Sequence, residues 1–132
     1  NFVSKKKNLG FEAVTAKGED YLKNDAPKFD FVFLDAYDFD HGKHSELRQT
    51  RYEKNLGSKI DETECHIMHL KCAYSVEEKL KEGGIVCIDD TWQDEDGNWT
   101  AKGTLAVPHL LSRGFRIIEA RNRAILMIKE LI

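Results

Sequence analysis

Cysteine is scarce in this chain, and its spacing excludes several kinds of site. The three cysteines among 132 residues, Cys65, Cys72 and Cys87, form no CxxC pair and no metal-ligand spacing. An odd number without a disulfide framework is typical of a reducing compartment. The sequence also lacks a secretory signal and any apolar run near the roughly 20 residues that a membrane-spanning helix needs. We therefore expect a cytoplasmic protein with no membrane partner.

The common phosphate-binding and nucleophile motifs are missing too. The chain contains no GxGxxG, no GxxxxGK[ST] and no GxSxG, so dinucleotide-binding, nucleoside-triphosphatase and serine-hydrolase functions lose their main support. A basic excess is also lacking, because the formal net charge is -3, and nucleic-acid binding usually needs a basic patch or stripe. The one dense basic run, Lys5 to Lys7, is more typical of a solvated terminus. The expected partner is a small molecule rather than a nucleic acid.

What the chain does contain is an alternation of strand and helix patterns. Asp61 and Glu64 form a box-like N-cap pattern for a long helix, and Gly83-Gly84 follow it as the expected C-cap. The polar stretch 36–59 is long enough to be a functional lid or to contain a short helix of its own. The expected elements are, in order, strand 9–15, a helix opening at 16–22, strand 29–34, helix 60–82, strand 85–88, helix 104–112, and a hairpin of strands 115–119 and 124–128. This alternation predicts a single α/β domain over residues 1–132.

Two of the predicted strands end abruptly in aspartate. Residues 31–34 lead into Asp35, and residues 85–88 lead into Asp89 and Asp90. Such continuous apolar runs predict strands buried on both faces, and open α/β sheets bind ligands at the carboxyl ends of their strands. Neighbouring strands lie about 5 Å apart, so the carboxylates would be within reach of one ion or substrate. Because hard oxygen ligands suit Mg²⁺, the three aspartates are candidate metal ligands; the alternative is that they only cap turns and following helices.

Histidine supplies a candidate general base. His41 and His44 are spaced i, i+3, as are His66 and His69, a spacing that puts each pair on one face of a helix. For His66 and His69 we expect only a partly exposed helix face. His41 lies just beyond Asp35 in the polar stretch, and an unperturbed imidazole titrates near neutrality. His41 is therefore the candidate catalytic base or substrate contact.

Several motifs follow one another in a telling order. A Gly-acidic turn at Gly18-Glu19-Asp20 precedes the motif FDFVFLDA at 29–36. A helix follows and leads into residues 80–91, which contain an L..GG motif and a strand that ends in two acidic residues. A final hairpin begins at 114–118. In this order the motifs resemble the second half of a class I S-adenosylmethionine-dependent methyltransferase. The resemblance covers most of residues 9–129. It implies a partial Rossmann-like methyltransferase sheet of mostly parallel strands, with a C-terminal antiparallel hairpin.

Within that family, the chain is similar to small-molecule O-methyltransferases. The resemblance implies methyl transfer from S-adenosylmethionine to a small-molecule oxygen nucleophile. It also implies that Gly18, Glu19 and Asp35 contact the cofactor, and that Asp35, Asp89 and Asp90 hold an optional Mg²⁺ ion. Catechol-type members have an Asp-Asn pair where this chain has Asp89-Asp90.

The chain departs from the family in two further places. Asp38 stands where that subgroup often has a lysine, which excludes a lysine base at this position. The glycine-rich cofactor turn and the first two strands are missing; in the family these strands lie between the ones matched by 11–15 and 29–34. We therefore expect a gap in the sheet and weak cofactor binding by this chain alone. Either an N-terminal segment is missing, or the first strand pairs elsewhere, for example across a homodimer. The alternatives are a non-catalytic interaction module of the same fold and a metal-dependent hydrolase that uses the same aspartates.

Overall fold

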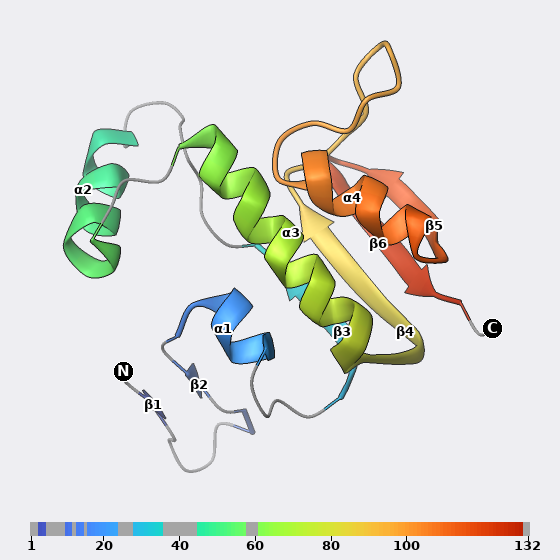
Figure 1. Ribbon diagram of the computed structural model, residues 1–132, viewed down its shortest axis with the longest axis horizontal. Helices are drawn as coiled ribbons and strands as arrows, with labels where there is room; N and C mark the ends of the chain where they lie inside the picture. The colour runs from blue at the N-terminus through green and yellow to red at the C-terminus, as the bar shows by residue number, and fades with distance from the viewer. Residues whose placement is uncertain are drawn as a thin grey trace.

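The computed structural model describes residues 3–4, 10–11, 13–14, 16–23, 28–35, 45–57 and 61–130. Its elements alternate between strands and helices, as the sequence pattern predicts (Figure 1). In chain order they are β1 (Val3–Ser4), β2 (Ala13–Val14), α1 (Gly18–Lys23), β3 (Phe29–Leu34), α2 (Ser45–Leu56), α3 (Glu62–Lys79), β4 (Leu80–Asp89), α4 (Gly103–Ser112), β5 (Phe115–Arg121) and β6 (Ala124–Lys129).

The main sheet is mixed and has the strand order β3-β4-β6-β5. β3 pairs with β4 in parallel, whereas β6 is antiparallel to both β4 and β5. The predicted α/β class and the C-terminal antiparallel hairpin are confirmed. The mostly parallel arrangement is not shown, because the last strand inserts between β4 and β5 and makes two of the three pairings antiparallel.

The hairpin between β5 and β6 turns through two residues with left-handed backbones. Asn122 has φ 54° and Arg123 has φ 62°. Positive φ at both central residues is the type I′ arrangement, whose twist matches that of the flanking strands. This turn brings β6 back alongside β5 and allows it to pair with β4.

Helices α1, α3 and α4 lie on the same side of the main sheet (Figure 1). The strand residues that face these helices are buried and form the core with apolar helix residues; they include Val86, Ile88, Ile125 and Met127 from the strands and Ala73, Val76, Val107 and Leu110 from the helices. On β3 the alternate residues Phe31 and Phe33 are each 54% exposed. The prediction that this strand is buried on both faces is therefore wrong for the described residues, because α3 and α4 pack on the same face of the sheet.

The long helix α3 begins as predicted but ends earlier. The Asp61 side chain accepts a hydrogen bond from the Glu64 N–H at 2.7 Å, which confirms the N-cap. The helix ends at Lys79, and Leu80 starts β4, so the predicted C-cap at Gly83-Gly84 is wrong. Both glycines lie within β4, where the register with β3 shifts.

The first predicted strand is present only in part and pairs outside the main sheet. β2 is antiparallel to β1, and the two form a separate two-stranded sheet. Among the described residues, β3 is at the edge of the main sheet and has one strand partner, β4. The polar stretch contains α2, in agreement with the short-helix alternative. None of the helices in the described ranges is long and apolar enough to cross a membrane.

Candidate functional site

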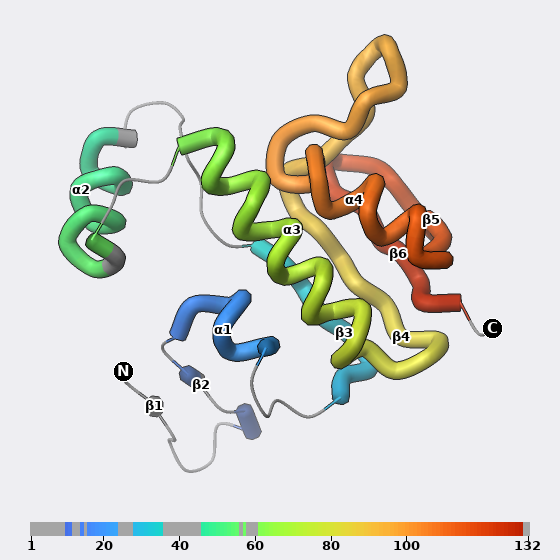
Figure 2. Tube along the Cα trace, in the orientation of Figure 1, coloured from blue at the N-terminus to red at the C-terminus, as the bar shows by residue number. Residues whose placement is uncertain are grey.

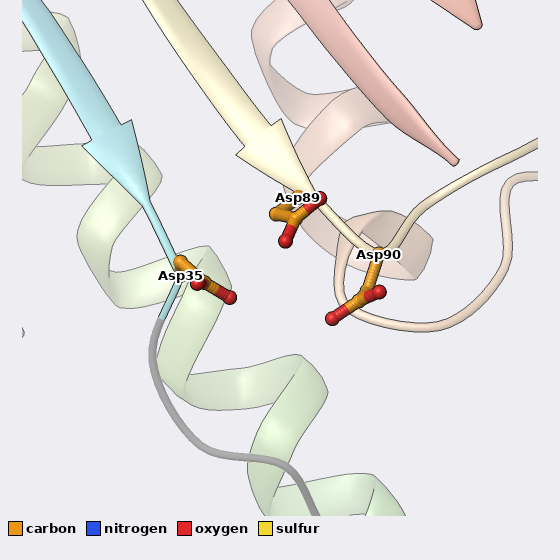
Figure 3. A group of neighbouring side chains, drawn as sticks. All are labelled: Asp35, Asp89 and Asp90. Atoms are coloured by element: carbon orange, nitrogen blue, oxygen red, sulfur yellow. The ribbon is translucent and has the colours of Figure 1, made fainter. Parts of the chain in front are cut away.

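Three carboxylates meet where β3 and β4 end. Asp35 directly follows β3, Asp89 is the last residue of β4, and Asp90 comes next. Because β3 and β4 are parallel and Leu34 pairs with Ile88, the two strand ends are in register. One carboxylate oxygen from each aspartate lies within 4.8 Å of the others. Figure 3 shows the three side chains around a common space, so the predicted cluster, which we call the aspartate cluster, does form.

A buried lysine occupies this cluster. Lys102 is only 3% exposed, and its Nζ donates a 2.8 Å hydrogen bond to Asp35 Oδ1 and lies 3.2 Å from Asp90 Oδ2. Lysine is almost never buried to this extent unless it is paired with an acid. Sequence reasoning missed Lys102, because it follows a long polar loop and belongs to none of the recognised motifs.

The backbone around the loop 90–102 fixes the lysine in place. The Lys102 N–H donates to the Asp90 carbonyl at 3.1 Å, which closes the base of the loop. Asp90 and Ala101 have φ values of 52° and 56°, a left-handed region that non-glycine residues rarely adopt. In Figure 2 the loop leaves the carboxyl end of β4 and returns to the start of α4. Lys102 is therefore held beside Asp90 by main-chain geometry as well as by charge.

Thr91 and Gly103 pack tightly beneath this loop. Thr91 is 1% exposed, and its hydroxyl donates to the Thr100 carbonyl at 2.9 Å. A Cβ on Gly103 would lie 2.2 Å from Thr91 Oγ1, a distance that forbids any side chain there. The glycine thus lets α4 begin in contact with Thr91, directly after Lys102.

The outer part of the loop is a hydrogen-bonded turn. Asp94 Oδ1 accepts from the N–H groups of Asp96 and Asn98, both at 2.9 Å. An aspartate side chain that bonds to main-chain N–H groups a few residues further on is typical of a turn. Trp92 is 38% exposed, and the Arg123 guanidinium lies 4.2 Å from its ring centroid.

His69 is buried near the aspartate cluster rather than on a partly exposed face. It is 0% exposed, which corrects the prediction for this histidine, whereas His66 is half-buried. The His69 Nδ1–H donates to the Cys65 carbonyl at 2.8 Å, and within the described ranges Nε2 is buried without a hydrogen-bond partner. Burial lowers the pKa of His69, the hydrogen bond to Cys65 opposes this, and the nearby Lys102 charge lowers the pKa further. The imidazole is therefore neutral near pH 7.

The two cysteines closest to the predicted site residues are poor nucleophiles. Burial, and then the carboxylates of Asp89 and Asp35, raise the pKa of Cys87. Burial, and then Glu19, raise the pKa of Cys72 to about 12. Because the thiolate is the reactive form, neither side chain is suited to covalent catalysis.

Gly18 and Glu19, the other predicted cofactor contacts, lie at the start of α1. Glu19 lines a cavity of about 630 Å³ between α1 and α3, and none of the three aspartates lines it; its residues are Lys17, Glu19, Asp20, Lys23, Lys71, Tyr74, Ser75 and Glu78. One carboxylate oxygen of Glu19 is buried and has no hydrogen-bond partner within the described part of the chain. The structure thus brings Asp35, Asp89 and Asp90 together but shows no contact between them and Glu19. His41, the predicted base, lies outside the described residues.

The chemistry of the aspartate cluster decides whether a divalent ion fits. Three carboxylates are a suitable donor set for Mg²⁺. However, a Mg²⁺ ion about 2.0–2.1 Å from these oxygens would lie beside the Lys102 ammonium. Like charges about 4 Å apart repel by about 4 kcal/mol per unit of charge at an effective dielectric constant of about 20. Lys102 therefore weakens the attraction of the aspartate cluster for a divalent ion.

No protein-family model and no curated protein matches this sequence.

Proposed function

We propose that the protein containing this chain transfers a methyl group from S-adenosylmethionine to a small-molecule oxygen nucleophile. The observation that carries the proposal is the order of the strands. In the methyltransferase family the last strand of the chain lies in the sheet between the two strands that precede it in the sequence, and β6 lies between β4 and β5 in the same way. The fold alone is compatible with many functions. The proposal therefore also depends on the positions of the acidic residues.

The acidic residues lie where this reaction would need them. Asp35, Asp89 and Asp90 are at the carboxyl ends of two parallel neighbours, the edge at which open α/β sheets bind ligands. The buried oxygen of Glu19, which has no hydrogen-bond partner among the described residues, would accept a hydrogen bond from an amino group such as that of adenine. These positions support a nucleoside cofactor near Glu19 and a polar acceptor near the aspartate cluster.

The proposed reaction is a direct displacement, and the bound cofactor would supply an activated methyl group on its sulfonium. The acceptor oxygen bonds to the methyl carbon while the carbon–sulfur bond breaks, which leaves a thioether, and the acceptor proton passes to a base. His41 remains the proposed base. Asp35 and Asp90, held by Lys102, would orient the acceptor hydroxyl, and such positioning supplies much of the rate in reactions of this type.

Calorimetric titration of the full-length protein with S-adenosylmethionine and its demethylated product tests the proposal. We expect both to bind, and we expect Glu19→Gln to weaken binding by roughly 10-fold, since it removes a charged acceptor. Glu95→Gln is the matched control, because Glu95 is exposed in the outer loop. If the folded full-length protein binds neither compound, the methyltransferase proposal is wrong, and the non-catalytic module becomes the better hypothesis.

A further inference from the structure

The position of Lys102 indicates which group balances the negative charge of the aspartate cluster. Its ammonium is 2.8 Å from Asp35 Oδ1 and 3.2 Å from Asp90 Oδ2. These carboxylates come from different strands, and the lysine that joins them is 3% exposed. A surface lysine would gain little from such contacts and would lose side-chain freedom. A buried lysine shared by two acids is instead part of the internal structure of the site.

The surrounding backbone prevents this lysine from being an easily displaced side chain. Lys102 follows the left-handed residue Ala101, and its N–H is bonded to Asp90, the second left-handed residue. Such conformations cost roughly 1 kcal/mol or more each and persist only where the surroundings impose them. Gly103, on the other side of Lys102, is pressed against Thr91. The start of α4 is therefore locked in the position that places the ammonium at the carboxylates.

We infer that Lys102 is the built-in cation of the aspartate cluster and takes the place that a divalent metal would occupy. The ammonium supplies positive charge to Asp35 and Asp90 and orients both, so the cluster needs no bound metal to hold its shape. This inference is independent of methyl transfer, because the same contacts would exist in a non-catalytic protein. It departs from the resemblance, which implies Mg²⁺ at these three aspartates. Lys102 acts here as a positioning residue.

Manganese binding, followed by electron paramagnetic resonance, tests this inference. Mn²⁺ uses the same oxygen ligands as Mg²⁺ and loses its free-ion signal when it binds. The wild-type protein should show no site at the cluster. Lys102→Met, which keeps the length and removes the charge, should gain one Mn²⁺ site with affinity increased on the order of 100-fold or more. The double variant Lys102→Met/Asp89→Asn should lose that site again.

Two control variants separate the charge of Lys102 from its other effects. Lys102→Arg keeps a cation and should bind no Mn²⁺. Lys81→Met removes a cation from an exposed pair with Asp30 and should also gain no site. If the wild-type protein binds Mn²⁺ and Asp89→Asn removes that binding, the inference is wrong. This comparison tests the inference even if Lys102→Met does not fold. A folded Lys102→Met that binds no Mn²⁺ would overturn it as well. Neither result depends on S-adenosylmethionine, so failure here is distinct from failure of the proposed function.

Discussion

Replacing Gly103 with alanine should destabilise the protein by distorting the support of Lys102. The added Cβ would lie 2.2 Å from Thr91 Oγ1, 2.7 Å from Val107 Cγ2 and 2.9 Å from Thr91 Cβ. Thr91 and Val107 are 1% and 0% exposed, so neither can move aside into solvent. Both are also β-branched, and such side chains have few alternative rotamers.

The size of the effect follows from comparison with Gly18. Both glycines are the first residue of a helix, and neither has a positive φ. A Cβ on Gly18 would meet only Cys72 Sγ, at 3.9 Å, which is an ordinary contact. Alanine in place of glycine stabilises a compatible site by about 0.4–1 kcal/mol, whereas overpacking a core costs about 1–3 kcal/mol. Because the two effects have opposite signs, the free energies of unfolding of the two variants should differ by roughly 1.4–4 kcal/mol, or about 6–16 °C in Tm at about 4 °C per kcal/mol.

Urea denaturation followed by tryptophan fluorescence measures this difference, since Trp92 and Trp99 lie within the loop 90–102. We expect Gly103→Ala to unfold at lower urea than wild type, and Gly18→Ala at the same concentration or higher. Thr91→Ala removes the nearest atom, so Gly103→Ala should cost less in that background, with a coupling of about 0.5–3 kcal/mol. A Gly103→Ala protein as stable as Gly18→Ala would refute the reasoning.

Two further predictions concern a buried histidine and the uncovered face of β3. Burial lowers the pKa of His69 below 6.5 in the native state, so below that pH the unfolded chain binds a proton at His69 that the native state does not. The contribution of the neutral imidazole to the free energy of unfolding is therefore complete above pH 6.5. It falls as the pH drops toward the native pKa, by up to about 1.4 kcal/mol per pH unit. Urea midpoints at about pH 7.5 and about pH 5.5 should differ less for His69→Leu than for wild type, and an identical dependence would contradict this account. Phe33, 54% exposed, and Leu34, 7% exposed, are neighbours on opposite faces. Phe33→Thr should cost roughly 1 kcal/mol or less, and Leu34→Ala about 2–5 kcal/mol; equal losses in urea denaturation would contradict the assignment of the covered face.

Much of the fold could be predicted because its signals are local. The apolar runs before Asp35 and Asp89 and the cap formed by Asp61 and Glu64 each depend on a few adjacent residues. The same locality explains the prediction of the aspartate cluster, since two parallel neighbouring strands bring their ends together. The end of α3 was misplaced because Gly83 and Gly84 are a strong helix-end signal that here serves an irregular strand instead.

The remaining features depend on contacts between distant residues. Lys102 pairs with Asp35 across 67 positions of the chain, and no spacing rule connects them. The burial of His69 likewise depends on how α3 packs. The exposure of Phe31 and Phe33 depends on which face the helices cover, and a continuous apolar run looks the same whether one face is covered or both. These were the places where sequence reasoning failed.

The cost of the arrangement around Lys102 argues that it serves more than stability. Burying a lysine with two carboxylates brings a desolvation penalty, and well-packed apolar residues of similar size are often as stable or more so. The left-handed backbones of Asp90 and Ala101 add strain to this penalty. A chain selected only for a stable sheet edge would have no reason to keep three acids, a buried lysine and two strained residues at one point. The arrangement is explained if Asp35 and Asp90 must be held in a fixed orientation at the ligand-binding edge of the sheet, and Lys102 is the residue that holds them.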